Sequence, residues 1–122
     1  MKVYFHVFVT HNDKLLVVNS PTQREYFVPG TVMLTADPYD EFLIKTVQRF
    51  TGLTVFIKKP FFLRDDVVRT ERTMEIFLEA QAASDEVKLS SELLDAKWIE
   101  PENYASENTV EHLHQAFEAY SE

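Results

Sequence analysis

The sequence predicts an α+β fold, a mixed β-sheet with one helix on each face. Short apolar segments with the alternation typical of strands recur along the chain. Two segments show helical apolar spacing instead, at residues 38–51 and 110–120, and they fall at separate points among the strands. A chain of 122 residues is long enough to bury a hydrophobic core without disulfides or structural metal ions. We therefore expect residues 1–122 to form a single domain.

The first third of the chain predicts three strands. Residues 2–9 alternate with both faces largely apolar, which is typical of a central strand buried on two sides. An Asn-Asp turn signal at 12–13 indicates that residues 15–18 return as the second strand of a hairpin. A polar loop follows. Residues 26–28 are then expected to form a short strand that ends at Pro29.

The middle of the chain predicts a loop followed by a helix at 38–51. Asp37 stands in the N-cap position and Pro38 in the first turn. Gly52 is the expected helix stop. Residues 53–63 should be extended, and Pro60 makes part of this strand an edge or a bulge.

The last part of the chain predicts two strands and a helix. Residues 65–72 are expected to form a charged turn, and 73–80 a strand with one wetter face. A polar connection leads to a short strand at 96–99. Asn108 and Glu111 are a candidate capping box for the final helix. Its expected apolar stripe consists of Val110, Leu113, Phe117 and Tyr120.

Composition narrows the class of partner. The chain has no cysteine, which excludes disulfides, a thiolate zinc site and a Cys nucleophile. The net charge is −8 with no basic block, so nucleic acid is not an expected partner. No run approaches membrane-spanning length, so a membrane is not expected either. We expect a small-molecule or protein partner and a reducing, cytoplasmic setting.

The segment 29–53 resembles the signature box of the Nudix hydrolase superfamily, Gx5Ex7REUxEExGU, in which U is a bulky aliphatic residue. Pro29 and Gly30 match the residues that usually open the box, and the flanking segments extend the similarity over nearly the whole chain. Asp37 and Lys45 are same-charge replacements of the family's Glu and Arg. The positions interpreted as the structural frame of the box are Gly30, Asp37, Lys45, Val47, Gly52 and Leu53.

The resemblance implies a Nudix-like α/β/α sandwich and hydrolysis, with Mg2+, of nucleoside diphosphates linked to another moiety. The chain departs from the box at the chemical positions. Thr31 stands where the second glycine belongs, and Thr46, Arg49 and Phe50 stand where the family has Glu, Glu and Glu. Positions 46, 49 and 50 share a helix face, and carboxylates there would hold Mg2+. We therefore expect metal-dependent activity to be weak or lost, with no catalytic residue assigned.

A first hypothesis is that the protein still binds a nucleotide-like or phosphorylated ligand. Arg49, with Arg24 and Thr46, is the candidate ligand-binding set, because guanidinium groups bind phosphate directly. The plainer interpretation is that Arg49 pairs with a surface carboxylate and that Phe50 simply packs.

Two further hypotheses stay open. In one, the protein is an active pyrophosphohydrolase whose Mg2+ ligands have moved to residues such as Asp40, Glu41 and Glu79, although an ordinary helix pair with Lys45 explains Glu41 better. In the other, the fold is a protein-interaction scaffold, for which the Phe-Phe pair at 61–62 is either an edge feature or core. The sequence does not tell the oligomeric state, and a homodimer stays open.

The histidines are interpreted as structural. His6 lies inside the first strand, where a hydrogen-bonded role is favoured over a catalytic one. His112 and His114 are two residues apart on the last helix, so they point to different sides and are expected to be solvated rather than to chelate a metal.

Overall fold

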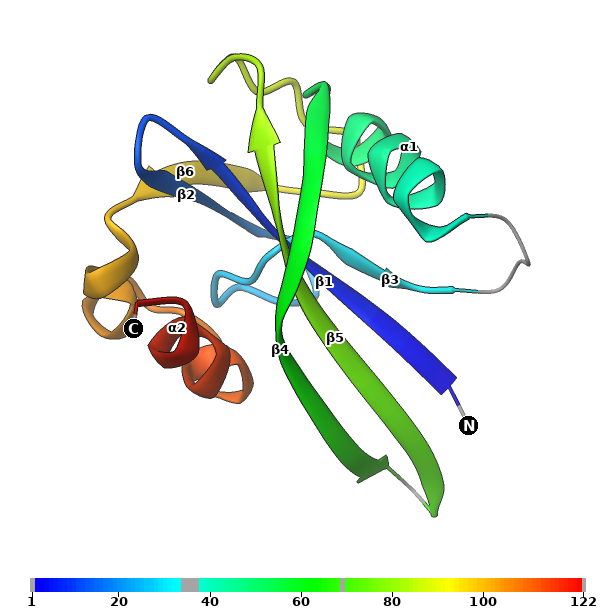
Figure 1. Ribbon diagram of the computed structural model, residues 1–122. Helices are drawn as coiled ribbons and strands as arrows, with labels where there is room; N and C mark the ends of the chain where they lie inside the picture. Colours follow the sequence, from blue (N-terminus) through cyan, green and yellow to red (C-terminus); the bar gives the residue numbers. More distant parts are fainter. Residues whose placement is uncertain (1, 34–37, 69, 122) are drawn as a thin grey trace.

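In the computed structural model, residues 2–33, 38–68 and 70–121 are described. They form one six-stranded sheet with helices on both sides (Figure 1). The elements, in chain order, are β1 (Lys2–His11), β2 (Lys14–Asn19), β3 (Gly30–Val32), α1 (Tyr39–Thr51), β4 (Val55–Val68), β5 (Glu71–Ala82), β6 (Asp95–Ile99), the 3-10 helices η1 (Pro101–Ser106) and η2 (Glu111–Leu113), and α2 (His114–Ser121). None of the helices in this part of the chain is both long and apolar enough to cross a membrane.

The sheet is mixed, and its strand order is β4-β5-β1-β2-β6, with β3 pairing with β1 off this path. The expectation of a central first strand is confirmed, because β1 pairs in parallel with β5 along one edge and with β2 and β3 along the other. Figure 1 shows α1 and α2 on opposite sides of the sheet. The predicted α+β class is therefore confirmed.

Alternation along the strands divides the core into two clusters. On the α1 side, Val7, Val18 and Leu78 pack with Leu43 and Val47 of the helix. On the α2 side, a second cluster of buried residues contains Phe8, Leu15, Val17, Phe77, Leu113 and Phe117. Each large apolar side chain buried in this way contributes about 1.5–3 kcal/mol to folding. The predicted apolar stripe at 110, 113, 117 and 120 is confirmed, because all four residues belong to this second cluster.

The two glycines of the chain stand where a side chain meets an obstacle. A Cβ on Gly30 would collide with the carbonyl oxygen of Phe5, so β3 can approach β1 this closely only with glycine. Gly52 has a φ of 73° and donates its N–H to Gln48 O, which ends α1 as predicted. The helix begins at Tyr39 with Pro38 in the N-cap position. The expected N-cap, Asp37, lies outside the described residues.

The prediction of a third strand at 26–28 was wrong in position. Tyr26 and Phe27 form only isolated bridges. The third strand of the chain is β3, which follows Pro29 and pairs with β1. A strand at that edge needs close approach to Phe5, and Gly30 is the residue that permits it.

The predicted charged turn at 65–72 was also wrong, because β4 and β5 continue through it as a hairpin. Charged residues here are partners between neighbouring strands: the Arg72 guanidinium donates hydrogen bonds to both carboxylate oxygens of Asp65. The expected irregularity at Pro60 is confirmed by register shifts on both sides of it. The centre of the β5 face that was expected to be wetter is buried, since Glu75 is 6% and Phe77 0% exposed.

The candidate capping box at the final helix was wrong. Asn108 adopts a φ of 56°, and Val110 is the N-cap of η2 with no side-chain cap hydrogen bond. The regular helix α2 starts only at His114. The Phe-Phe pair at 61–62 is partly buried against the α2-side cluster, so the core interpretation is confirmed.

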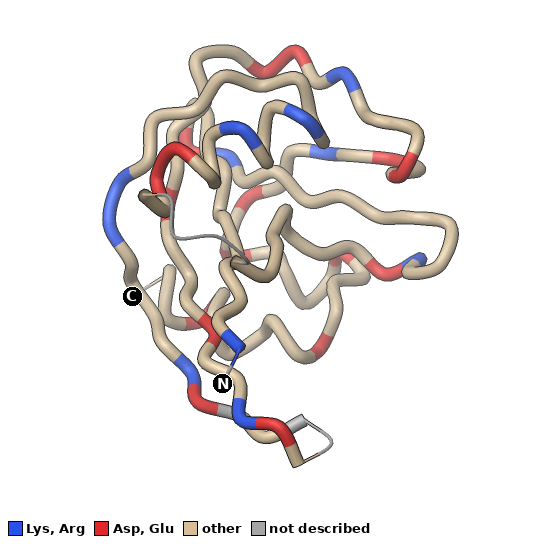
Figure 2. The backbone as a smooth tube through the Cα atoms, turned by 90° about the vertical axis from the view of Figure 1, so that its right-hand side faces the viewer, with Lys and Arg blue, Asp and Glu red and all other residues tan. Residues whose placement is uncertain are grey.

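Charged residues of both signs are interspersed over the molecule. In the view of Figure 2, Lys and Arg occur in short stretches among Asp and Glu, including at the end of the β4–β5 hairpin. The expectation that nucleic acid is not a partner stays a prediction.

Candidate functional site

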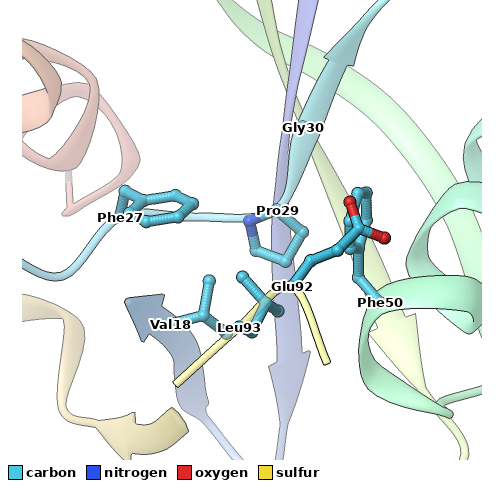
Figure 3. A pocket seen from close by; sticks show the side chains of 7 residues that line it. All are labelled: Val18, Phe27, Pro29, Gly30, Phe50, Glu92 and Leu93. Atoms are coloured by element: carbon cyan, nitrogen blue, oxygen red, sulfur yellow. The ribbon is translucent and has the colours of Figure 1, made fainter. Parts of the chain in front are cut away.

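A pocket of about 200 Å³ lies between the sheet and the C-terminal end of α1. Its walls come from four places in the chain: β2, the segment that leads into β3, the last turn of α1, and the connection between β5 and β6. In the view of Figure 3, Phe27 lies to the left of Pro29, and Glu92 and Phe50 lie to its right. The lining residues are Val18, Phe27, Pro29, Gly30, Phe50, Glu92 and Leu93.

The end of α1 holds the β5–β6 connection in place. The last carbonyl groups of a helix have no partner within the helix and need one from outside. Here Phe50 O accepts a hydrogen bond from Ser90 N at 3.0 Å, and Thr51 O accepts one from Lys88 N at 2.8 Å. Residues 88–90 thus satisfy the helix end, and the chain that follows brings Glu92 and Leu93 to the pocket.

The pocket is apolar except for one carboxylate. Three of its lining residues are aliphatic or proline and two are aromatic, whereas Glu92 is its only charged lining residue among those described. Within the described part of the chain, Glu92 takes part in no ion pair or hydrogen bond. An apolar concavity with one convergent polar group is typical of a small-molecule site.

The three predicted ligand-binding residues lie around α1 and the loop before β3. Thr46 is buried, and its hydroxyl donates to Phe42 O at 2.8 Å. The guanidinium carbon of Arg49 lies 4.5 Å from the ring centroid of the neighbouring Phe50, a cation–π contact. Arg24 is exposed, and its carbonyl accepts a hydrogen bond from Asn19 Nδ2. None of the three lines the pocket, but Phe50, which contacts Arg49, does.

The box helix does not offer the ligands that Mg2+ requires. Magnesium is held by oxygen ligands, usually carboxylates. On this helix face the Thr46 hydroxyl is already used within the helix, Arg49 is a cation, and Phe50 has no oxygen. The side chains therefore do not fit the divalent metal that the Nudix box implies.

The candidates for relocated ligands do not converge. Asp40 and Glu41 are exposed in the first turn of α1, on one side of the sheet. Glu79 faces the other side, where its Oε2 accepts a hydrogen bond from the Tyr120 hydroxyl at 2.6 Å. Residues 2–33, 38–68 and 70–121 contain no group of three His, Asp or Glu side chains that could hold a metal ion.

The structural positions of the box occupy the places that packing requires. Val47 and Leu53 are almost completely buried in the α1-side core. Lys45 and Glu41 are exposed, and among the ion pairs of the described residues there is none between them.

A second polar cluster lies on the α2 side of the sheet and was not foreseen. Glu75 accepts hydrogen bonds from His6 Nε2 at 2.9 Å and from Arg64 Nε at 2.8 Å. His112 Nε2 lies 2.9 Å from Glu75 Oε1 and 2.6 Å from Arg64 Nη2. A neutral imidazole can serve only one of these groups through Nε2. His6 is thus the hydrogen-bonded strand residue that was predicted.

The electrostatics of this cluster follow from burial and from its basic groups. Burial raises the pKa of Glu75, but the hydrogen bonds from His6, Arg64 and His112 outweigh it and hold that pKa far below its ordinary value. Burial lowers the pKa of His6 in spite of its bond to Glu75. His112 is exposed, as expected for a solvated helix residue, but it also contacts Glu75. For His114 the expectation of solvation was wrong, because this residue is partly buried and contacts the Thr109 hydroxyl at 2.9 Å.

Glu92 and Leu93 were missed in the sequence. They lie in the connection between β5 and β6, some forty residues after the box, and no spacing rule links them to it. The sequence signal for these two residues was an acidic residue followed by two apolar residues within a polar stretch. Because that pattern is common in loops, it did not single out a site.

No family model matches the chain, and no curated protein matches it. Solved structures match its fold along nearly the whole length. A MutT protein from Methanosarcina mazei Go1 has a TM-score of 0.81 at 16% identity, covering 98% of this chain and 92% of that one. For a Nudix family hydrolase from Clostridium perfringens the TM-score is 0.78 at 18% identity, covering 98% and 95%. An ADP-ribose pyrophosphatase from Streptococcus suis gives 0.71 at 18% identity, covering 99% and 92%. The chain has the Nudix fold.

Proposed function

We propose that this protein binds a small nucleotide-like molecule in the pocket beside Phe50 and does not hydrolyse it by the metal-dependent route of Nudix hydrolases. The observation that carries the proposal is the place of Phe50. It lines the pocket with an aromatic ring at a box position where the family pattern has a carboxylate. Absence of cysteine supports a reducing, cytoplasmic setting for this activity.

The chemistry of the helix face supports binding without a metal. A cation at Arg49 beside Phe50 repels a divalent ion and attracts a phosphate. We therefore assign the pocket to an apolar or aromatic part of the ligand and Arg49 to a phosphate outside the pocket. Solved structures with this fold include an ADP-ribose pyrophosphatase, so a nucleotide-like ligand is the natural first class to test.

Restoring the box tests the metal half of the proposal. The variant Thr46→Glu/Arg49→Glu/Phe50→Glu returns three carboxylates to one face of α1, and it should gain Mn2+ binding that the wild-type protein lacks. Binding is measured by the loss of the free Mn2+ signal in electron paramagnetic resonance. Lys45→Glu/Gln48→Glu is the matched control, because it adds carboxylates to the same helix at exposed positions.

Binding and turnover are then measured on the wild-type protein. Calorimetry with a nucleotide panel should give heat of binding that does not depend on Mg2+ and that weakens in Arg49→Ala. Release of phosphate or pyrophosphate by the wild-type protein in Mg2+, or Mn2+ binding as tight as that of the restored variant, would contradict the proposal. Absence of any nucleotide binding would favour the scaffold hypothesis instead.

A further inference from the structure

We infer that the pocket selects a flat heteroaromatic ring that presents N–H donors along one edge, and that Glu92 is the residue that recognises that edge. The chemical class is an aminopyrimidine or aminopurine ring. The inference rests on the proposed function, because it concerns the ligand of the same pocket.

Glu92 is an exposed residue at the pocket, and its carboxylate has no donor among the described residues. An ionised carboxylate offers two acceptor oxygens and no donor, and Glu92 makes no hydrogen bond or ion pair with the described residues. It is also the one charged side chain among the described residues of an otherwise apolar lining. A ligand that binds here gains most if it brings N–H groups, since hydrogen bonds to a charged group contribute about 1.5–3 kcal/mol each.

The other walls favour a ring. Phe27 and Phe50 are aromatic, and Pro29 lies between them in the view of Figure 3. Aromatic side chains pack against flat rings in stacked or edge-to-face arrangements. The volume of about 200 Å³ is below the range of roughly 300–1,000 Å³ typical of sites that enclose a drug-sized ligand. The pocket therefore suits one ring system rather than a whole nucleotide.

The same carboxylate excludes an anion from the pocket. Glu92 is an exposed residue at the pocket, and its carboxylate would repel a phosphate placed beside it as a like charge. A phosphorylated ligand must therefore keep its phosphate outside the pocket. Arg49, an exposed residue whose guanidinium carbon lies 4.5 Å from the centroid of the Phe50 ring, supplies a basic group beside this wall.

The backbone around Glu92 is held on both sides. Ser90 N donates to Phe50 O at 3.0 Å before it, and Leu94 N donates to Asn19 O at 2.8 Å after it. One of these acceptors lies on α1 and the other on β2, so the two flanking bonds tie the segment to both walls of the pocket. Such preorganisation lowers the entropic cost of binding.

The test uses matched pairs of small rings with and without an amino group. The probes are 2-aminopyrimidine against pyrimidine, adenine against purine, and phenyl phosphate as the anionic ring. Binding to the 15N-labelled full chain is followed by chemical-shift perturbation at pH 7. The aminated rings should shift the amides of Phe50 and Leu93 and bind about tenfold or more tightly than their partners, the ratio expected from one lost bond to a charged group.

Two carboxylate variants isolate Glu92. Glu92→Gln should remove most of the preference for the aminated ring. Glu86→Gln, an exposed carboxylate of the same connection that does not line the pocket, should leave the preference unchanged. Phenyl phosphate should bind more weakly than either aminated ring in the wild-type protein and gain affinity in Glu92→Gln.

The outcomes separate this inference from the proposed function. Equal binding of aminated and plain rings, or a Glu92→Gln variant with unchanged preference, overturns the role of Glu92 while binding in the pocket stands. Binding of Mn2+ to the wild-type protein that is lost in Glu92→Gln also overturns it, because Glu92 would then be a metal ligand. If no ring or nucleotide shifts any pocket amide of the wild-type protein, the proposed function itself fails.

Discussion

At the scale of single residues, Glu75 has a buried charge that only its neighbours make tolerable. Its side chain is 8% exposed and bonds to Arg64, whose own side chain is 17% exposed. The three basic partners come from β1, β4 and η2, so one carboxylate joins two strands to the segment that leads into α2. Removing one partner of a buried pair leaves the other without compensation.

Glu75→Gln should therefore lower the free energy of unfolding at pH 7 by about 3 kcal/mol, the low end for breaking a buried ion pair. Urea denaturation followed by circular dichroism measures it. Asp65→Asn is the matched control, because it removes a carboxylate from an exposed pair with Arg72, and it should cost clearly less. If both variants lost the same free energy of unfolding, the buried pair of Glu75 would stabilise the protein no more than the exposed pair of Asp65.

The pH dependence of this difference has a definite sign. The folded-state pKa of Glu75 lies below its ordinary value of 4.5, so its contribution to stability is complete above about pH 4.5 and is lost as the pH falls toward the folded-state pKa. The gap in stability between the wild-type protein and Glu75→Gln should therefore narrow below pH 4.5. The lowered pKa of His6 adds a decline in stability as the pH falls below 6.5.

The sequence allowed His6 to be interpreted correctly as a bonded strand residue, but not its partner. Periodicity places a residue on a face of its own strand. It does not tell which strand of the other half of the chain will lie beside it, and Glu75 is 69 positions away. The same reason explains why Glu75 was expected on a wetter face and Glu92 was not noticed at all.

At the scale of elements, the box helix and the β5–β6 connection are one structural unit. At Gly52 the two pack closely, because a Cβ there would lie 3.0 Å from Lys88 Cβ. The residue also has a φ of 73°, a value that is common for Gly, less so for Asn, and rare for other residues.

Gly52→Ala should destabilise the protein by about 1–2 kcal/mol from left-handed strain alone, and it should weaken ring binding by moving the connection that contains Glu92. Gly52→Asn tolerates the backbone angle but still adds a Cβ. It should therefore recover part of the stability and little of the binding. Thermal unfolding and the chemical-shift titration measure the two effects separately, and full recovery of both in Gly52→Asn would rule out the contact with Lys88.

Elements with strong local patterns were predictable, and those defined by tertiary contacts were not. The apolar period of 38–51 and Gly52 sufficed to predict α1 within one residue. The prediction placed a turn at 65–72, within the hairpin of β4 and β5, because charged residues such as Asp65 and Arg72 are typical of turns. In the structure these two residues pair with each other across the two strands. The glycine-dependent approach of β3 to β1 has no signal in local spacing at all.

At the scale of the whole molecule, β4 is a long edge strand of the sheet. Its first half contains Lys58, Lys59 and Pro60, all exposed. Lysine and proline on an edge hinder pairing with a strand of another molecule. Phe56, on the same strand, is 70% exposed and would be a hazard without them.

Lys58→Thr/Lys59→Thr/Pro60→Thr should therefore convert the protein to concentration-dependent oligomers, measured by sedimentation velocity. Lys14→Thr/Lys45→Thr removes the same charge from exposed positions elsewhere and should leave the sedimentation coefficient of the wild-type protein unchanged. Association of both variants would point to net charge rather than to the β4 edge.

The parallel pairing of β1 with β5 also determines how the sheet can be assembled. Every partner in this ladder is 71 residues away, from Lys2 with Thr73 to Thr10 with Gln81 (73 − 2 and 81 − 10). The entropy of closing so long a loop is lost before the strand contacts that compensate for it can form. This slows folding more than it reduces the stability of the folded protein. During synthesis, β1 has two apolar faces and one open edge until residue 82 is available. The first strand can therefore pair with β5 only after most of the chain has been synthesised. Its central place in the sheet is expected to slow folding.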